Sequence, residues 1–198
     1  MTPGLLIAFE GLDQSGKQTQ AEALRATLAA HGRACRLLSF PDYTTPIGDE
    51  IGRALRGERE FSADVMQLLY VANRHERKPE IEQALASGVT LLCDRYVASS
   101  IAYGEAQGLD PSWLALIQQF LPAPDLTILL DIAPETAAGR KAAGRDRYER
   151  DLALLSRVRA SYSRQAVSAG WVHLDGERPR DVVAADVLSA VSTRLGRQ

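Results

Sequence analysis

The 198-residue sequence contains only two cysteines, Cys35 and Cys93, and its formal net charge is only −2. Both cysteines lie beside or inside apolar, strand-like runs, so we interpret them as core thiols and not as a disulfide or a metal pair. The small net charge excludes an overall field that would attract nucleic acid or an anionic membrane. We therefore expect neither as a partner, and any anion-binding site must be a local cluster of arginine and lysine.

Long apolar runs and targeting signals are also missing. No stretch approaches the roughly 20 apolar residues that cross a bilayer. The N-terminal residues lead directly into a strand-like run, with no basic segment and no cleavage site before it. These observations predict a cytoplasmic protein without a membrane partner. Repeats, low-complexity tracts and long linkers are absent as well, so we expect one domain over residues 1–198.

Strand-like and helix-like segments alternate along the chain, which is typical of a parallel sheet with helices on both faces. The run 126–132 is continuously apolar, so we expect it inside the sheet, and Pro79 predicts a break or kink in its helical segment. The predicted strands are residues 5–10, 36–40, 89–93, 126–132 and 171–174. The predicted helices include residues 20–30, 47–55, a segment capped by Ser62, 80–87, 111–121 and 179–195.

A glycine-rich segment, GLDQSGK, separates the first predicted strand from the first predicted helix. In this context the motif forms a P-loop, whose backbone N–H groups and helix N-terminus bind phosphates, while Lys17 supplies a positive charge. Gln18 stands where a serine or threonine hydroxyl normally meets Mg²⁺. The sequence therefore predicts nucleotide phosphates on a loop made of Gly11, Leu12, Asp13, Gln14, Ser15, Gly16, Lys17, Gln18 and Thr19.

Asp94 and Arg95 follow the third predicted strand, at the sheet edge where α/β proteins bind ligands. A carboxylate here is placed to orient Mg²⁺, and the planar arginine fork suits a phosphate group. A surface ion pair is the simpler alternative, but the phosphate loop in the same sheet favours the functional interpretation. We predict that Asp94 helps to hold Mg²⁺ and that Arg95 binds a phosphate.

Five basic residues lie within residues 139–150. A charged run is often no more than a solvated face. Phosphoryl transfer, however, depends on arginine, lysine and magnesium to offset the repulsion between phosphates. We therefore interpret residues 139–150 as a basic lid that closes over the substrates.

Four linked motifs resemble those of the thymidylate kinase family, and the similarity extends over nearly the whole chain. They are FEGLD at residue 9, FPDYTTPIG at residue 40, LLYVANR at residue 68 and DRYVASSIAY at residue 94. The resemblance implies a P-loop NTPase fold, a homodimer, and phosphorylation of dTMP by ATP with Mg²⁺ on the path to dTTP.

The resemblance also implies roles for individual residues. Asp13 lies near the sugar 3′-hydroxyl and the metal, Tyr70 stacks on thymine, and Arg74 binds thymine O4. Arg95 binds the dTMP phosphate, and Tyr103 crowds the 2′ position. Phe40 and Tyr43 belong to the same acceptor motifs, Ser99 and Ser100 lie where the family contacts the base or the nearby sugar, and Arg145 and Arg147 are the lid arginines. The sequence itself does not fix the adenine contacts, for which Arg140 and the turn at residues 176–179 are candidates.

Several residues depart from the family pattern. Tyr43 stands where many members have an arginine. Gln14 replaces a basic loop residue found in one subgroup; members without that residue carry arginines in the lid, and Arg145 and Arg147 match them. Gly104 stands where a polar residue is usual, and nothing in the sequence explains it.

We infer direct in-line transfer without a general base. The acceptor phosphate has a second pKa of about 6, so it is largely dianionic at neutral pH and has no proton that must be removed.

Three other functions compete with this one. Another small nucleoside or nucleotide kinase shares the loop, although Arg74 and Tyr103 favour a thymine deoxynucleotide. A GTPase-like switch is suggested by DEIG at residue 49, but this segment falls in a predicted helix and no N-K-x-D motif accompanies it. A catalytically silent nucleotide-binding module is disfavoured because the acceptor and lid groups are present.

Overall fold

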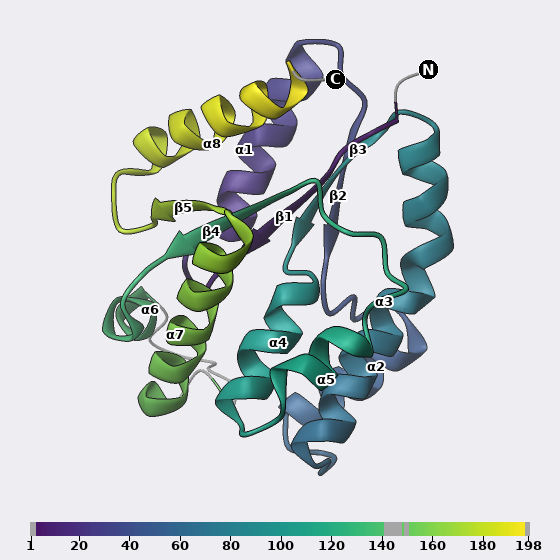
Figure 1. The fold of residues 1–198 in the computed structure, drawn as a ribbon, viewed down its shortest axis with the longest axis vertical. Coiled ribbons are helices and arrows are strands. Elements are labelled where there is room, and N and C mark those ends of the chain that lie inside the picture. Colours follow the sequence, from purple (N-terminus) through teal and green to yellow (C-terminus); the bar gives the residue numbers. More distant parts are fainter. Residues whose placement is uncertain (1–2, 141–147, 149–150, 197–198) are drawn as a thin grey trace.

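The computed structural model describes residues 3–140, 148 and 151–196, which build a five-stranded parallel sheet in the order β2-β3-β1-β4-β5. The sheet confirms the predicted α/β architecture (Figure 1). Apolar runs form the inner strands because helices cover both faces of the sheet. The strands are β1 (Leu6–Glu10), β2 (Cys35–Ser39), β3 (Thr90–Asp94), β4 (Leu126–Asp131) and β5 (Val172–Asp175).

The strand register brings the ends of three strands to one edge of the sheet. Asp94 at the end of β3 is level with Phe9 of β1 on one side and with Ser39 of β2 on the other. Leu129 of β4 is level with Glu10. The loops that follow β1, β2 and β3 therefore open on the same edge, where the sequence predicted the ligand site.

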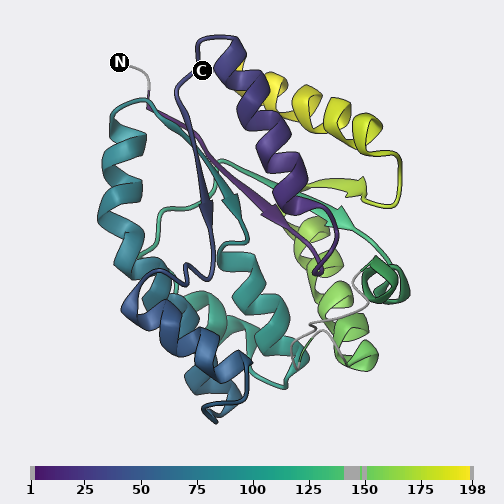
Figure 2. The same ribbon diagram turned by 180° about the vertical axis from the view of Figure 1, so that it is seen from behind.

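Two helical layers enclose the sheet. In Figure 1, α3 (Ala63–Ala86), α4 (Val97–Ala106) and α7 (Leu152–Ala169) cover one face. Figure 2 shows α1 (Lys17–Ala30) and α8 (Arg180–Leu195) on the other. The remaining helices are α2 (Pro46–Leu55), α5 (Pro111–Leu116) and α6 (Pro134–Arg140).

Successive side chains of β1 point to opposite faces of the sheet, so β1 contributes to a hydrophobic core on each face. Ile7 and Phe9 pack with residues of α1 and α8, whereas Leu6 and Ala8 pack with α3 residues. Cys93 is fully buried on the α3 side and Cys35 is half-buried, and both are free thiols, as predicted. No helix among the described residues is long and apolar enough to span a membrane.

Some element boundaries differ from the sequence prediction. Of the predicted break or kink at Pro79, the break is wrong, because α3 runs without interruption through this residue. Ile81 and Ala84 are buried against the sheet, and this packing stabilises the turns beyond the proline. The helix that begins at Pro111 ends at Leu116 and continues only as turns. The DEIG segment lies inside α2, as expected.

Candidate active site

The loop between β1 and α1 has a shape that depends on its glycines. Gly11 has φ +139°, and a Cβ there would lie 2.3 Å from the carbonyl oxygen of Leu130. Gly16 adopts the left-handed conformation as the N-cap of α1. A side chain at either position would strain the turn, so the glycines keep the loop backbone close to the helix N-terminus, as a phosphate cradle requires.

Lys17 is the first residue of α1 and is almost completely buried. Its Nζ donates a hydrogen bond of 2.7 Å to the carbonyl oxygen of Leu12. Burial, followed by the nearby charge of Arg95, lowers the pKa of Lys17 to about 8. A bound polyphosphate would favour the charged form, so this lysine is suited to respond to a nucleotide.

Arg95 lies against the phosphate loop, although the two are far apart in sequence. Its Nη1 donates to the carbonyl oxygen of Gly11 over 3.1 Å, and its Nη2 forms a 2.8 Å ion pair with Asp13. Lys17 and Arg95 line one open cavity of about 600 Å³. The structure therefore brings the predicted donor and acceptor cations to a single crevice.

Asp13 connects the phosphate loop to α4. Tyr103 donates a hydrogen bond of 3.0 Å to Oδ2 of Asp13, and its ring lies under the Arg95 guanidinium. Burial alone would raise the pKa of Asp13, but the positive charges of Arg95 and Lys17 hold that pKa well below its ordinary value. Asp13 is therefore a carboxylate throughout the physiological pH range.

A buried polar cluster supports the Arg95 side chain from behind. Nη1 also donates to the hydroxyl oxygens of Ser99 and Tyr162, each over 3.2 Å. Ser99 in turn donates to Glu10, a fully buried carboxylate at the end of β1, over 2.6 Å. Ser99 is thus engaged beneath Arg95, although it was predicted to contact the base or sugar. The roles of Glu10 and Tyr162 were not predicted from the sequence. The one available signal was that Glu10 is an acidic residue at the end of an apolar run.

Asp94 faces the large cavity beside Lys17. Its Oδ1 is buried and has no hydrogen-bond partner among the described residues. An unpaired buried carboxylate oxygen at a phosphate site fits a divalent cation. Within residues 3–140, 148 and 151–196, no cluster of three or more His, Cys, Asp or Glu side chains could hold a metal by itself.

A second, narrower cavity of about 90 Å³ adjoins the first and shares Arg95 with it. Arg74 on α3 is buried in its wall, where Nη1 donates to Ser100 over 2.8 Å and to Gln118 over 3.1 Å. Burial lowers the pKa of Arg74 from its ordinary value, and its guanidinium lies over the Phe40 ring. The predicted acceptor residues that line this cavity are Asp13, Phe40, Tyr43, Tyr70, Arg74, Arg95, Ser99, Ser100 and Tyr103.

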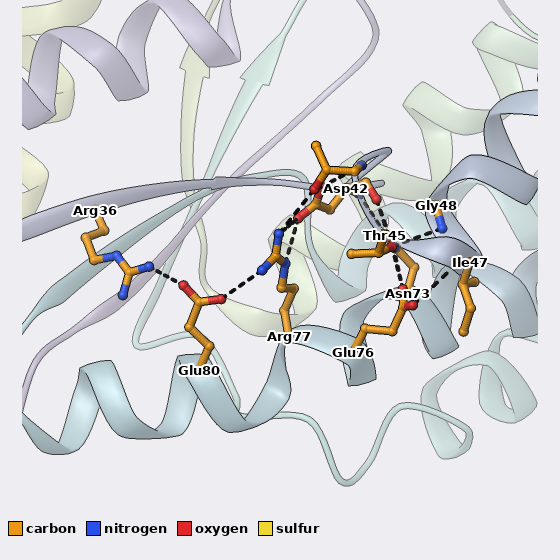
Figure 3. A network of polar contacts seen from close by, with 10 residues as sticks. Arg36, Asp42, Thr45, Ile47, Gly48, Asn73, Glu76, Arg77 and Glu80 are labelled. Atoms are coloured by element: carbon orange, nitrogen blue, oxygen red, sulfur yellow. Dashed lines mark hydrogen bonds and ion pairs between the residues drawn. The ribbon is translucent and has the colours of Figure 1, made fainter.

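The turn that carries Tyr43 to both cavities is held by a polar network from α3 (Figure 3). Asn73 accepts a hydrogen bond from the Asp42 amide over 2.8 Å and donates to Thr45 over 2.8 Å. Arg77 forms an ion pair with Asp42, and Glu76 accepts from the Thr45 hydroxyl over 2.6 Å. The side chains of one helix thus fix the position of the turn.

Arg140, at the end of α6, connects the phosphate loop with the turn after β5. Its Nη1 donates to the Gln14 carbonyl over 3.0 Å and its Nη2 to the Gly176 carbonyl over 3.1 Å. Both Arg140 and Gly176 line the large cavity, and their contact with adenine stays a prediction. The lid arginines, Arg145 and Arg147, lie outside the described residues.

Gly104 has an explanation in packing. A Cβ on this α4 residue would lie 2.6 Å from a methyl group of Leu114, which is completely buried on α5. The glycine therefore permits the close approach of α4 and α5 behind the narrow cavity.

A P-loop at the end of the central strand, a buried lysine and an arginine-lined acceptor cavity define the class: this is a P-loop protein built for phosphoryl transfer between two bound molecules. Residues 9–187 match the family model for thymidylate kinase. A thymidylate kinase of Arabidopsis thaliana is 42% identical over 147 residues, which are 74% of this chain and 56% of that protein. One from Schizosaccharomyces pombe is also 42% identical, over 74% of this chain and 70% of its own length.

The solved structure of thymidylate kinase from Candida albicans superposes with a TM-score of 0.87 at 30% identity, over 99% of this chain and 94% of that one. This similarity confirms the predicted P-loop NTPase fold. The chain belongs to the thymidylate kinase family, whose members are nucleoside monophosphate kinases that act on dTMP.

Proposed function

We propose that this protein transfers the γ-phosphoryl group of ATP directly to dTMP, giving ADP and dTDP for dTTP synthesis. An oxygen of the dTMP phosphate attacks the γ-phosphorus in line, and the bond to the β,γ-bridging oxygen breaks. The acceptor is largely dianionic at neutral pH, so no general base is required. Catalysis then consists of positioning and charge neutralisation.

The observation that carries the proposal is the contact between Arg95 and the phosphate loop. In our assignment, the loop amides and Lys17 hold the ATP phosphates, whereas Arg95 grips the dTMP phosphate. The guanidinium is hydrogen-bonded to Gly11 and Asp13 of that loop. A phosphate on Arg95 would therefore meet one on the loop, and in-line transfer requires this proximity.

The narrow cavity is the proposed site for the base and sugar. Tyr70 stacks on thymine and Arg74 donates to O4, a carbonyl that cytosine replaces with an amino group. Ser100 is hydrogen-bonded to Arg74 and lies in the same wall. Tyr103 is held against Asp13, a position from which it would crowd a 2′-hydroxyl and so favour deoxyribose.

Mg²⁺ is the proposed metal, held by Asp94 and Asp13 together with the ATP phosphates. When bound, Mg²⁺ would neutralise charge on the phosphate oxygens. Support comes from the unpaired Oδ1 of Asp94 and from the anionic state of Asp13. Arg140, Arg145 and Arg147 are proposed to add positive charge over the phosphates. A single domain with a lid at residues 139–150, a homodimer and a cytoplasmic location remain predictions.

A coupled ADP-release assay tests the reaction. We expect ADP release with ATP, Mg²⁺ and dTMP, and little without dTMP or with thymidine, which lacks the acceptor phosphate. A stronger response to CMP or UMP would identify a different nucleotide kinase, and one to thymidine a nucleoside kinase. ADP release that does not depend on any acceptor would indicate a hydrolytic switch, and its complete absence a silent binding module.

A further inference from the structure

Gln67 on α3 is a buried polar side chain whose hydrogen-bonding groups are unused. The residue has no exposed surface, and it lines the narrow acceptor cavity. Neither Nε2 nor Oε1 has a hydrogen-bond partner among the described residues. Native proteins seldom leave a buried carboxamide unpaired, because each unmet group is costly and a partner is usually found in a ligand or water.

The position of Gln67 on the helix places it beside the proposed base. Gln67, Tyr70 and Arg74 are spaced by three and then four residues, so they follow one another along one face of α3. All three line the cavity. A base stacked on Tyr70 would therefore lie between the carboxamide and the guanidinium. Because the cavity is only about 90 Å³, an entering base must come into close contact with its walls.

Three other polar residues of this cavity already have hydrogen-bond partners, whereas Nε of Arg74, like the Gln67 carboxamide, has none among the described residues. Ser100 accepts from Arg74, and Ser99 donates to Glu10. Gln107 donates through Nε2 to the Tyr103 carbonyl. The facing position on α4 is Gly104, whose absent Cβ would lie 3.3 Å from Cγ of Gln67 and which offers no polar group. The Gln67 carboxamide thus combines an unused buried donor with an unused buried acceptor.

We propose that Gln67 determines base specificity by binding the imide edge of the pyrimidine. Oε1 accepts from N3–H and Nε2 donates to the adjacent O2 carbonyl, while Arg74 takes O4. This inference rests on the proposed function and extends it to a residue outside the family motifs described above. The contact selects pyrimidines that carry an N3 proton between two carbonyls, and it is indifferent to the 5-methyl group.

Gln67→Met tests the proposal because methionine keeps the length of the side chain and removes both polar atoms. The test substrate is the 3-deaza analogue of dTMP, a 4-hydroxy-2-pyridone in which C–H replaces N3–H and O4 becomes a hydroxyl. The change at O4 affects the wild type and the variant alike, so the effect at N3 is the difference between their losses. We expect kcat/KM of the wild type to fall roughly 10- to 100-fold on going from dTMP to the analogue. The variant should lose a similar factor with dTMP, and its own fall from dTMP to the analogue should be about tenfold smaller than that of the wild type, at unchanged KM for ATP.

Thermal unfolding of the free proteins supplies an independent readout. Removal of an unpaired buried amide should raise the melting temperature of Gln67→Met while dTMP turnover falls. Gln67→Leu provides the same comparison if the methionine variant does not fold.

Two results would overturn the inference: kcat/KM for dTMP within about twofold of wild type in the variant, or a full N3 penalty that persists without Gln67. A wild type that does not phosphorylate dTMP would refute the proposed function instead.

Discussion

Replacement of Arg95 by alanine removes the group that we assign to the acceptor phosphate. A charge-assisted hydrogen bond contributes about 1.5–3 kcal/mol, so loss of a two-pronged contact costs roughly 3–6 kcal/mol. This corresponds to a decrease of roughly 10²- to 10⁴-fold in kcat/KM for dTMP. The substitution also removes the positive charge of Arg95 from beside Asp13. The pKa of the Asp13 carboxyl should then rise, because burial raises it and one fewer positive charge lowers it.

Steady-state ADP release with varied dTMP measures the effect, and calorimetry measures ATP affinity separately. We expect ATP affinity within a few-fold of wild type, because Lys17 and the loop amides are unchanged. Arg95→Lys retains the positive charge but not the planar guanidinium, so its decrease in kcat/KM for dTMP should be smaller than that of Arg95→Ala. Arg164→Ala, which removes an exposed arginine paired with Glu105, is the matched control and should behave as wild type. Wild-type kcat/KM in folded Arg95→Ala, or a parallel loss of ATP binding, would refute the reasoning.

Four further predictions concern the loop, its lysine and the acceptor wall. Gly11→Ala forces a Cβ against a backbone carbonyl at 2.3 Å, so we expect a lower melting temperature and weakened ATP binding in calorimetry; an unchanged Kd contradicts this. Because the pKa of Lys17 is lowered to about 8, ATP binding at pH 8.5 should take up as much as roughly three quarters of a proton, as measured in buffers of different ionisation enthalpy. That uptake should vanish in Lys17→Met. Asn73→Leu leaves the Asp42 amide unpaired and should raise KM for dTMP without changing KM for ATP; equal shifts in both would argue against a role confined to the acceptor turn. Gly104→Ala should destabilise the fold by roughly 1–3 kcal/mol in chemical denaturation, and wild-type stability would mean that Leu114 moves freely.

Local patterns were sufficient to predict the sheet and the two ends of the crevice. The GLDQSGK segment can be identified as a phosphate-binding loop from its flanking strand and helix alone, and the structure contains both. Asp94 and Arg95 follow an apolar strand, and parallel strands present their carboxyl ends at a common edge. The placement of Arg95 at the same sheet edge as the phosphate loop could therefore be anticipated. Its contact with Asp13 also requires β3 to lie beside β1.

The supporting side chains could not be predicted because their surroundings are made by distant segments. Glu10 is buried where the Tyr96 amide and the hydroxyls of Ser99 and Tyr162, all from distant segments, supply its hydrogen bonds. Gln67 resembles any polar residue of a helix until α4 packs against it. Pro79 carries a strong local signal for a break, but the buried turns after it hold α3 together.

A crystal structure with ADP, Mg²⁺ and dTMP bound together would show whether two phosphate sites face each other in one crevice, as direct transfer requires. We predict the β-phosphate of ADP on the amides of Gly16 and Lys17, and the dTMP phosphate on the Arg95 guanidinium, with the two phosphates close enough to accommodate one transferred phosphoryl group. A dTMP phosphate bound away from Arg95, or one separated from the nucleotide by protein, would contradict the account.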